Sequence, residues 1–169
     1  MTYHVMQVAG AFIDLANRMD SRFTEGRLQK LLYIAQGWHL AITGKPLFES
    51  PIEAWNFGPL LPEVRESLKE CGSHPITADY ADSTLIDEDS LASELILRVW
   101  DYHGESSGVE LADITNSSKS PWRKVRALVG ADADSHPMIP TEAIRKEFHV
   151  RGAEGAHPIA AAFTAGPPA

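Results

Sequence analysis

Cysteine is almost absent from this sequence, and so are long apolar runs. The chain has 169 residues and a single cysteine, Cys71, so an internal disulfide is excluded and a reducing setting is expected. No apolar run approaches the roughly 18 residues that a membrane-spanning helix requires, and the first twelve residues lack the pattern of a secretion signal. We therefore expect a cytoplasmic protein without a membrane segment.

The motifs of the common enzyme classes are missing as well. The 7 histidines are scattered, with no cysteine partners and no zinc-binding spacing. His39 falls on the apolar stripe of an expected helix, where a hydrogen-bonded core histidine is the commoner explanation. Glycine-rich phosphate loops, nucleophile elbows and a basic setting for the cysteine are also lacking. These absences predict a protein that is not an enzyme and holds no cofactor or metal.

Charge is spread unevenly along the chain, whose net charge is -8. Residues 63–113 hold 13 acidic and 3 basic side chains, a net of -10, so the rest of the chain sums to +2. An acidic protein does not attract phosphate backbones through its overall field. We therefore expect bulk nucleic-acid binding to be disfavoured and a protein partner to be basic.

Apolar periodicity predicts a mainly α fold, a compact single-domain bundle of about six or seven helices. The first helix is expected to end near Met19, and the second to run from an N-cap at Thr24 to a left-handed stop at Gly44. Later helices are expected to begin at Pro62, Asp87, Ser107, Ser120 and Pro140, since these residues carry capping or first-turn signals. The inward face of the helix that follows Asp87 is expected to comprise Ala92, Leu95, Ile96, Val99 and Tyr102.

Two segments depart from this helical pattern. Residues 45–59 contain three prolines and short apolar runs, which predicts a small β element between the second and third helices. Residues 151–169 are rich in Ala, Gly and Pro and offer little to bury. They are expected to form a flexible tail, dispensable for folding, after a domain over residues 1–150.

Two groups of residues are candidates for contact with a partner. In residues 55–59 two large aromatic side chains adjoin a Gly-Pro turn; either both rings fill the core, or at least one remains on the surface as an interface anchor. On the second helix, three side chains lie opposite the apolar stripe, on a face that is either simply solvated or a partner site. The candidate partner-binding residues are Lys30, Tyr33, Gln36, Trp55, Asn56, Phe57, Gly58 and Pro59.

A DNA-binding alternative rests on the helix pair expected over residues 107–115 and 120–128. Its second helix and the turn before it carry four basic side chains that could reach phosphates, as in a helix-turn-helix. These are Lys119, Arg123, Lys124 and Arg126. The first helix of the pair is acidic through Glu110 and Asp113, which weakens this alternative.

Residues 28–40, 44–48 and 52–64 together resemble, in order and spacing, the Panacea family of antitoxin domains. The similarity extends more loosely through Trp122 to the segment from Ile144 to Phe148. One departure is Thr115-Asn116, where the family pattern leads us to expect Thr-His.

The resemblance implies a domain over residues 1–150 that neutralises a cognate toxin protein, encoded nearby, by direct contact. The sequence is most similar to the SocA-like branch of the family, which further implies a proteolytic adaptor that delivers the toxin to the ClpXP protease. The alternative function is a DNA-binding transcriptional regulator of its own operon.

Overall fold

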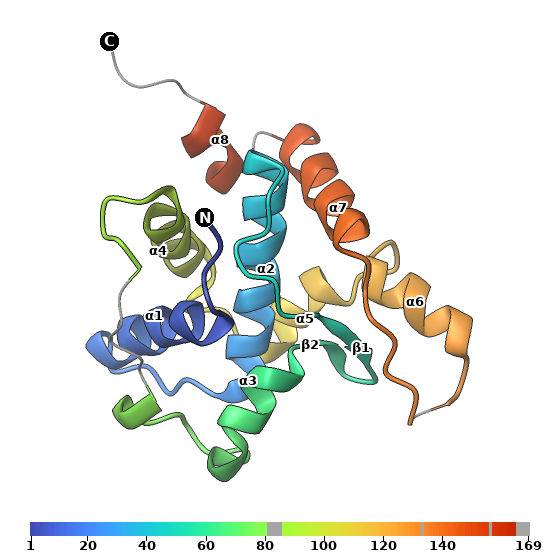
Figure 1. Cartoon of the computed structure of the whole chain (residues 1–169), viewed down its shortest axis with the longest axis horizontal. Helices are drawn as coiled ribbons and strands as arrows, with labels where there is room; N and C mark the ends of the chain where they lie inside the picture. The colour runs from blue at the N-terminus through green and yellow to red at the C-terminus, as the bar shows by residue number, and fades with distance from the viewer. Residues whose placement is uncertain (81–85, 133, 156, 165–169) are drawn as a thin grey trace.

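Helix α2 (Glu25–Thr43) runs through the middle of the molecule, and the other helices pack around it (Figure 1). The structure is a computed structural model that describes residues 1–80, 86–132, 134–155 and 157–164. The other helices are α1 (Val5–Arg18), α3 (Pro62–Ser67), α4 (Leu91–His103), α5 (Gly108–Thr115), α6 (Pro121–Val129), α7 (Thr141–Ala153) and α8 (Pro158–Thr164). Strands β1 (Glu53–Trp55) and β2 (Gly58–Leu60) lie between α2 and α3. The predicted mainly α fold with a small β element is confirmed.

The central position of α2 follows from its sequence. Every residue from 31 to 40 is buried, as expected for a helix that neighbours cover on all sides. Helices α1, α4, α5 and α7 all contact it. It ends as predicted at Gly44, which has a left-handed φ of 73° and whose N–H bonds to the carbonyl of Leu40.

The predicted start signals of several helices are confirmed. The Ser107 side chain accepts a hydrogen bond from Glu110 N–H, and the Glu110 carboxylate accepts one from Ser107 N–H, which together form a capping box at α5. Helix α4, however, is capped by Ser90 and begins after the acidic residues. Its predicted inward residue Tyr102 is exposed, because the buried stripe continues in steps of three and four to His103.

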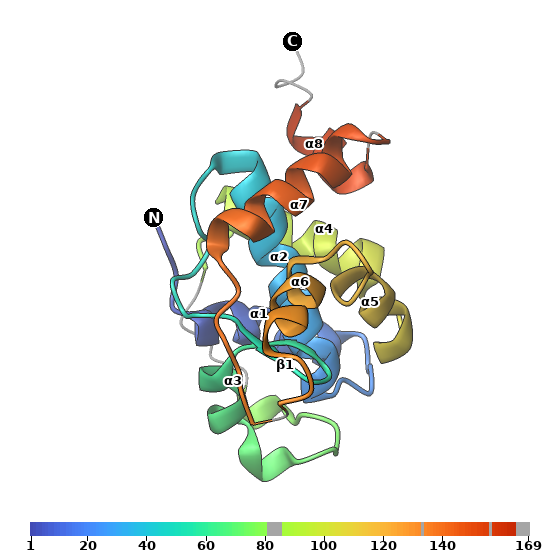
Figure 2. The same ribbon diagram turned by 90° about the vertical axis from the view of Figure 1, so that its right-hand side faces the viewer.

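The β element is an antiparallel hairpin with Glu53 opposite Leu60 and Trp55 opposite Gly58. A third segment extends it, since Glu53 also faces Met138 in an isolated antiparallel bridge. Figure 2 shows this third segment, which leads into α7, running in front of β1. The hairpin therefore lies between α3 and a segment that is distant in sequence.

Helix α7 approaches α2 very closely at Gly37. A Cβ atom at this position would lie 2.1 Å from Cδ2 of Phe148. The Phe148 ring also packs edge-on against Tyr33 and Trp38, with ring centroids 5.8 Å and 5.2 Å away. Glycine is therefore required at position 37 by the close approach and not by its backbone angles.

Replacing Gly37 with Ala should push α7 away from α2. We expect Gly37→Ala to lower the free energy of unfolding by about 1–3 kcal/mol or more, because overpacking a close contact costs that much. Gly26→Ala is the matched control, since Gly26 lies on the same helix with nothing within 4 Å of an added Cβ. Chemical denaturation of both variants measures the difference, and equal stabilities would contradict the close packing.

The C-terminal part of the chain differs from the predicted tail. Residues 158–164 form α8, which packs against α2 and α4 and buries Ile159. The His157 ring lies 4.6 Å from the Trp38 ring and 4.9 Å from that of Tyr102. Burial, with the nearby charges of His157 and Arg151, lowers the pKa of His103 beneath this helix to about 4. For the described residues 157–164 the expectation of little to bury is wrong, because Ile159 is buried and Ala160 and Phe163 also pack against the core.

Truncation after Arg151 should therefore destabilise the protein. We expect a loss of about 2 kcal/mol, because the shortened chain lacks the buried side chain of Ile159, and this corresponds to a melting temperature lower by roughly 4–8 °C. A chain that ends at Thr164 retains α8 and serves as the control. Thermal melts of the two shortened chains decide the matter, and identical melting temperatures would show that α8 contributes nothing.

Candidate protein-interaction surface

Two buried glutamines of α2 hold the polypeptide on either side of the hairpin. The Gln29 side chain accepts a hydrogen bond from Leu61 N–H (2.8 Å) and donates one to the Leu61 carbonyl (3.1 Å). Gln36 accepts from Leu47 N–H (2.8 Å) and donates to the carbonyl of Phe48 (2.8 Å). The two residues are seven apart, or two helical turns, and so lie on one face of α2. Each side-chain amide pairs with backbone N–H and C=O groups as a neighbouring strand would. Gln36 thus holds the chain before the hairpin, and Gln29 holds it after the hairpin.

The predicted partner-facing side of α2 is therefore internal. Gln36 and Tyr33 are buried, and the Tyr33 hydroxyl donates to the Glu147 carboxylate (2.8 Å), which also accepts from Arg151 (3.0 Å). Burial raises the pKa of Tyr33 well above its usual value, and burial also raises the pKa of Glu147. Lys30 is half-buried, and burial lowers its pKa. The expectation of an exposed polar face is wrong for Tyr33 and Gln36, because α7 and the segment after α2 cover it.

The tip of the hairpin is braced by α5. The Asn116 side chain donates to the carbonyl of Phe57 (3.0 Å) and accepts from the Thr115 hydroxyl (2.8 Å). Gly58 has a φ of 135°, and a Cβ there would lie 2.7 Å from Oδ1 of Asn116. The Thr115-Asn116 pair, which departs from the expected family pattern, thus supports the turn in this chain.

Helix α6 braces the same hairpin from its other side. The Trp122 indole N–H donates to the carbonyl of Trp55 (2.6 Å). Arg126 donates to the carbonyls of Ala54 (3.1 Å) and Ser135 (2.6 Å). Both α6 side chains thus bind the backbone of β1 and its neighbouring segment.

The four candidate phosphate contacts differ in their surroundings. Arg126 is engaged as described, and Arg123 donates to the carbonyl of Asn116 (3.3 Å) while its guanidinium lies over the Trp122 ring. Lys119 and Lys124 are exposed. Two of the four are therefore committed to holding the fold, which weakens the DNA-binding alternative.

The outward side of the hairpin carries a stacked group of rings around an exposed aromatic tip. Phe57 is 87% exposed. The half-buried Trp55 ring stacks on His136, with centroids 3.8 Å apart, and the Arg65 guanidinium lies 5.0 Å from its centre. We call the surface formed by Trp55, Phe57, Arg65, His136 and Met138 the hairpin face.

The exposure of the two rings bears on the alternatives that the sequence left open, core or interface, and excludes a core position for one of them. The core alternative is wrong for Phe57, whose ring points to solvent, and Trp55 is only partly covered. Gly58 and Pro59 are buried and shape the turn from inside, while Asn56 is exposed beside Phe57. Among the eight candidate residues, an aromatic tip and its immediate neighbours are thus what a partner could reach.

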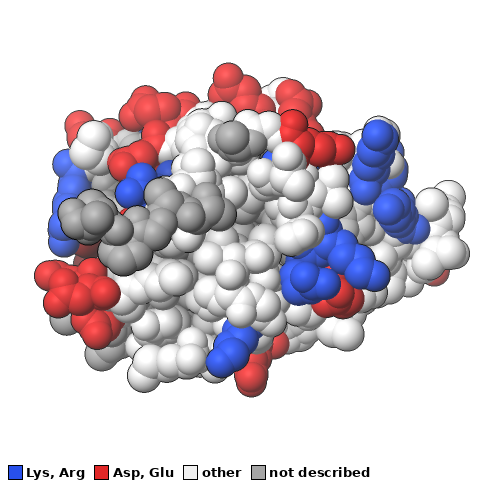
Figure 3. Space-filling view, turned by 90° about the horizontal axis from the view of Figure 1, so that it is seen from above, with Lys and Arg blue, Asp and Glu red and all other residues white. Residues whose placement is uncertain are grey.

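Acidic and basic side chains are unevenly distributed over the face shown in Figure 3. Most of the acidic side chains lie along its left and upper margins, and several lysines and arginines lie on its right-hand half, with a few more on the left. This arrangement agrees with the acidic excess of residues 63–113. Within the described ranges, no three His, Cys, Asp or Glu side chains are placed to hold a metal ion. None of the described helices has the length and apolar character needed to cross a bilayer.

Comparison with known proteins identifies the family. The profile of the family described as "Antitoxin SocA-like, Panacea domain" matches residues 28–123, more than half of the chain. The chain therefore belongs to this antitoxin family, which points to a non-catalytic regulatory protein. The Antitoxin SocA of Caulobacter vibrioides (strain NA1000 / CB15N) is 32% identical over 124 residues, covering 68% of this chain and 66% of that relative, just under two thirds. No solved structure matches the chain.

The match includes the hairpin and most of its braces. Gln29, Gln36, Asn116 and Trp122 all fall inside residues 28–123, whereas His136 and Met138 lie beyond them. The family match thus covers the hairpin, the two glutamines that hold its ends and two of its braces, while Arg126 lies beyond it.

Removal of the Asn116 brace should loosen the tip while the domain remains folded. We expect Asn116→Ala to cost about 1 kcal/mol, the usual contribution of one hydrogen bond, and to speed amide hydrogen exchange in residues 53–60 by about fivefold. Ser118→Ala is the control, because Ser118 is exposed on the neighbouring turn. Mass spectrometry measures the exchange rates of residues 53–60 in both variants. Rates equal to those of the unsubstituted chain in Asn116→Ala as well as in Ser118→Ala would contradict the bracing role.

Proposed function

We propose that this protein is an antitoxin that neutralises a cognate toxin protein by direct contact through the hairpin face. The observation that supports this most strongly is Phe57, a large aromatic side chain 87% exposed on a turn whose backbone Asn116 holds. Phe57 belongs to the hairpin face together with the half-buried Trp55 and the exposed Met138, and a cluster of exposed apolar side chains is typical of interaction sites. A rigid anchor also loses little conformational entropy on binding, so more of its contact energy contributes to affinity.

The charge distribution supports a basic partner. The net charge of -8 is concentrated in residues 63–113, and complementary fields chiefly raise the rate of association. The hairpin face itself carries Arg65 and His136 beside its aromatic rings. We infer that the acidic surface steers the toxin towards the protein and that the hairpin face forms the specific contact.

Delivery of the toxin to ClpXP is the finer part of the proposal. It is based on the resemblance to the SocA-like branch and on the similarity to a relative named as an antitoxin. Purified ClpXP should degrade the product of the neighbouring gene only when this chain is present. Neutralisation of the toxin without any such degradation would leave direct masking as the mechanism.

Phe57→Ala tests the interface directly. Because the ring is exposed, the variant should melt like the unsubstituted chain, while its affinity for the toxin falls by about 2 kcal/mol, or roughly 30-fold. Leu128→Ala is the matched control: Leu128 is 86% exposed on α6, and its truncation removes a similar exposed apolar group away from the hairpin face.

Calorimetric titration of both variants with the toxin, supported by growth rescue in cells that express it, provides the comparison. A Phe57→Ala protein that is folded and binds as tightly as Leu128→Ala would rule out the hairpin face as the toxin site.

A further inference from the structure

The segment next to β1 leaves a short strand edge unpaired. Ala54 N–H bonds to the carbonyl of Pro137, and Ile139 N–H bonds to that of Ile52, both at 2.8 Å. In an antiparallel pair this pattern turns the N–H and C=O of the residue between them, Met138, away from β1. Within the described residues these two groups have no hydrogen-bond partner, and Met138 is 62% exposed.

His136 extends the same edge by one step. It lies two residues before Met138, so its backbone groups point the same way, and they also lack a partner among the described residues. Pro137 and Pro140 interrupt and end the segment. Such a short edge bounded by prolines resists pairing with arbitrary strands, so a partner must gain affinity from side-chain contacts as well.

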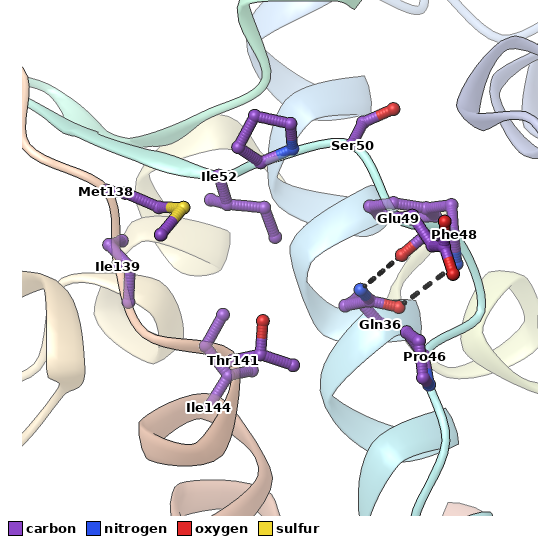
Figure 4. Close-up of a pocket in the computed structure, with 11 residues that line it drawn as sticks. Gln36, Pro46, Phe48, Glu49, Ser50, Ile52, Met138, Ile139, Thr141 and Ile144 are labelled. Carbon is purple, nitrogen blue, oxygen red and sulfur yellow. Dashed lines mark hydrogen bonds between the residues drawn. The ribbon is translucent and has the colours of Figure 1, made fainter.

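A pocket of about 170 Å³ lies beside this edge (Figure 4). It opens where the segments from Pro46 to Ile52 and from Met138 to Ile144 diverge, and Gln36 of α2 forms its floor. Its walls combine apolar side chains, among them Ile52, Ile139 and Ile144, with about as much polar surface, and Glu49 adds an exposed carboxylate that forms no ion pair in the described part of the chain. The pocket has room for one apolar side chain, with a negative charge close by.

We propose that an extended segment of the toxin pairs as an added strand with the edge at His136 and Met138 and inserts an apolar side chain into this pocket. A basic residue near that side chain would meet Glu49. This inference deepens the proposed function and rests on it, since the occupant is the toxin. The unpaired backbone groups favour a strand over a helix, because a helix has already satisfied its own N–H and C=O groups.

The edge also continues the hairpin face. His136 stacks on Trp55, and Met138 faces Glu53 across the bridge. A strand paired here would lie beside the Trp55 stack, so the same partner could also reach the tip at Phe57. The edge and the tip therefore form one continuous binding surface.

Met138→Pro tests the added strand. Proline removes the outward N–H of residue 138 but leaves both hydrogen bonds to β1, which are made by Ala54 N–H and Ile139 N–H. We expect the variant to fold and to bind the purified product of the neighbouring gene about tenfold or more weakly than Met138→Leu, which keeps the backbone N–H and an apolar side chain. A folded Met138→Pro protein with the affinity of Met138→Leu would overturn the proposal.

A second measurement on the unsubstituted chain keeps the test decisive if Met138→Pro does not fold. Amide exchange of Met138 and His136, followed by nuclear magnetic resonance, should slow by about tenfold or more in the toxin complex, because both N–H groups become hydrogen-bonded. Unchanged exchange at both amides in a complex that is sensitive to Phe57→Ala would overturn the added strand while the proposed function stands. Absence of any toxin complex would instead overturn the proposed function itself.

Discussion

The rest of the structure depends on the burial of α2 on all its sides. Neighbouring helices enclose it, so its polar side chains must find partners inside the protein, where an unpaired amide would be costly. Gln29 and Gln36 meet this requirement by bonding to the backbone at Leu61, Leu47 and Phe48. The same bonds that satisfy the helix therefore fix the chain on both sides of the hairpin.

The two ends of the hairpin are therefore held by different helices. Its base is tied to α2, while its tip and strand β1 are held by Asn116, Trp122 and Arg126 from α5 and α6. These side chains bind backbone carbonyls, so they fix where the turn lies without covering the Phe57 ring. A fixed platform that presents one exposed aromatic ring is a suitable arrangement for a protein whose role is contact with another protein.

Much of the helical framework could be predicted from local chemistry. The capping box at Ser107, the first-turn proline at Pro62 and the left-handed stop at Gly44 are signals contained within a few residues, and the structure bears them out. Tyr33 and Gln36 were harder to predict, because a polar stripe on a helix is usually solvated and only the tertiary arrangement shows that α7 and the following loop cover it. Two glutamines two turns apart inside an apolar run were the available signal, since buried amides need defined partners.

The candidate site could be predicted only in part for a similar reason. Residues 55–59 stand out in the sequence, yet which ring faces solvent depends on the helices that brace the turn. Arg126 looked like a phosphate ligand because composition shows a charge but not the carbonyls that it meets. The sequence does not predict the docking of α8, because Ile159 and Phe163 are isolated in an alanine-rich stretch and their burial depends on the surface offered by α2 and α4.

The central claim, that the braced turn is where the partner binds, is tested most directly by site-specific photo-crosslinking. A photoreactive phenylalanine analogue would be introduced at position 57 or at position 128, two exposed positions on different parts of the surface, and irradiated with the co-purified toxin. This account predicts a covalent adduct from position 57 and little or none from position 128. Crosslinking from position 128 alone, in a complex that still neutralises the toxin, would contradict it.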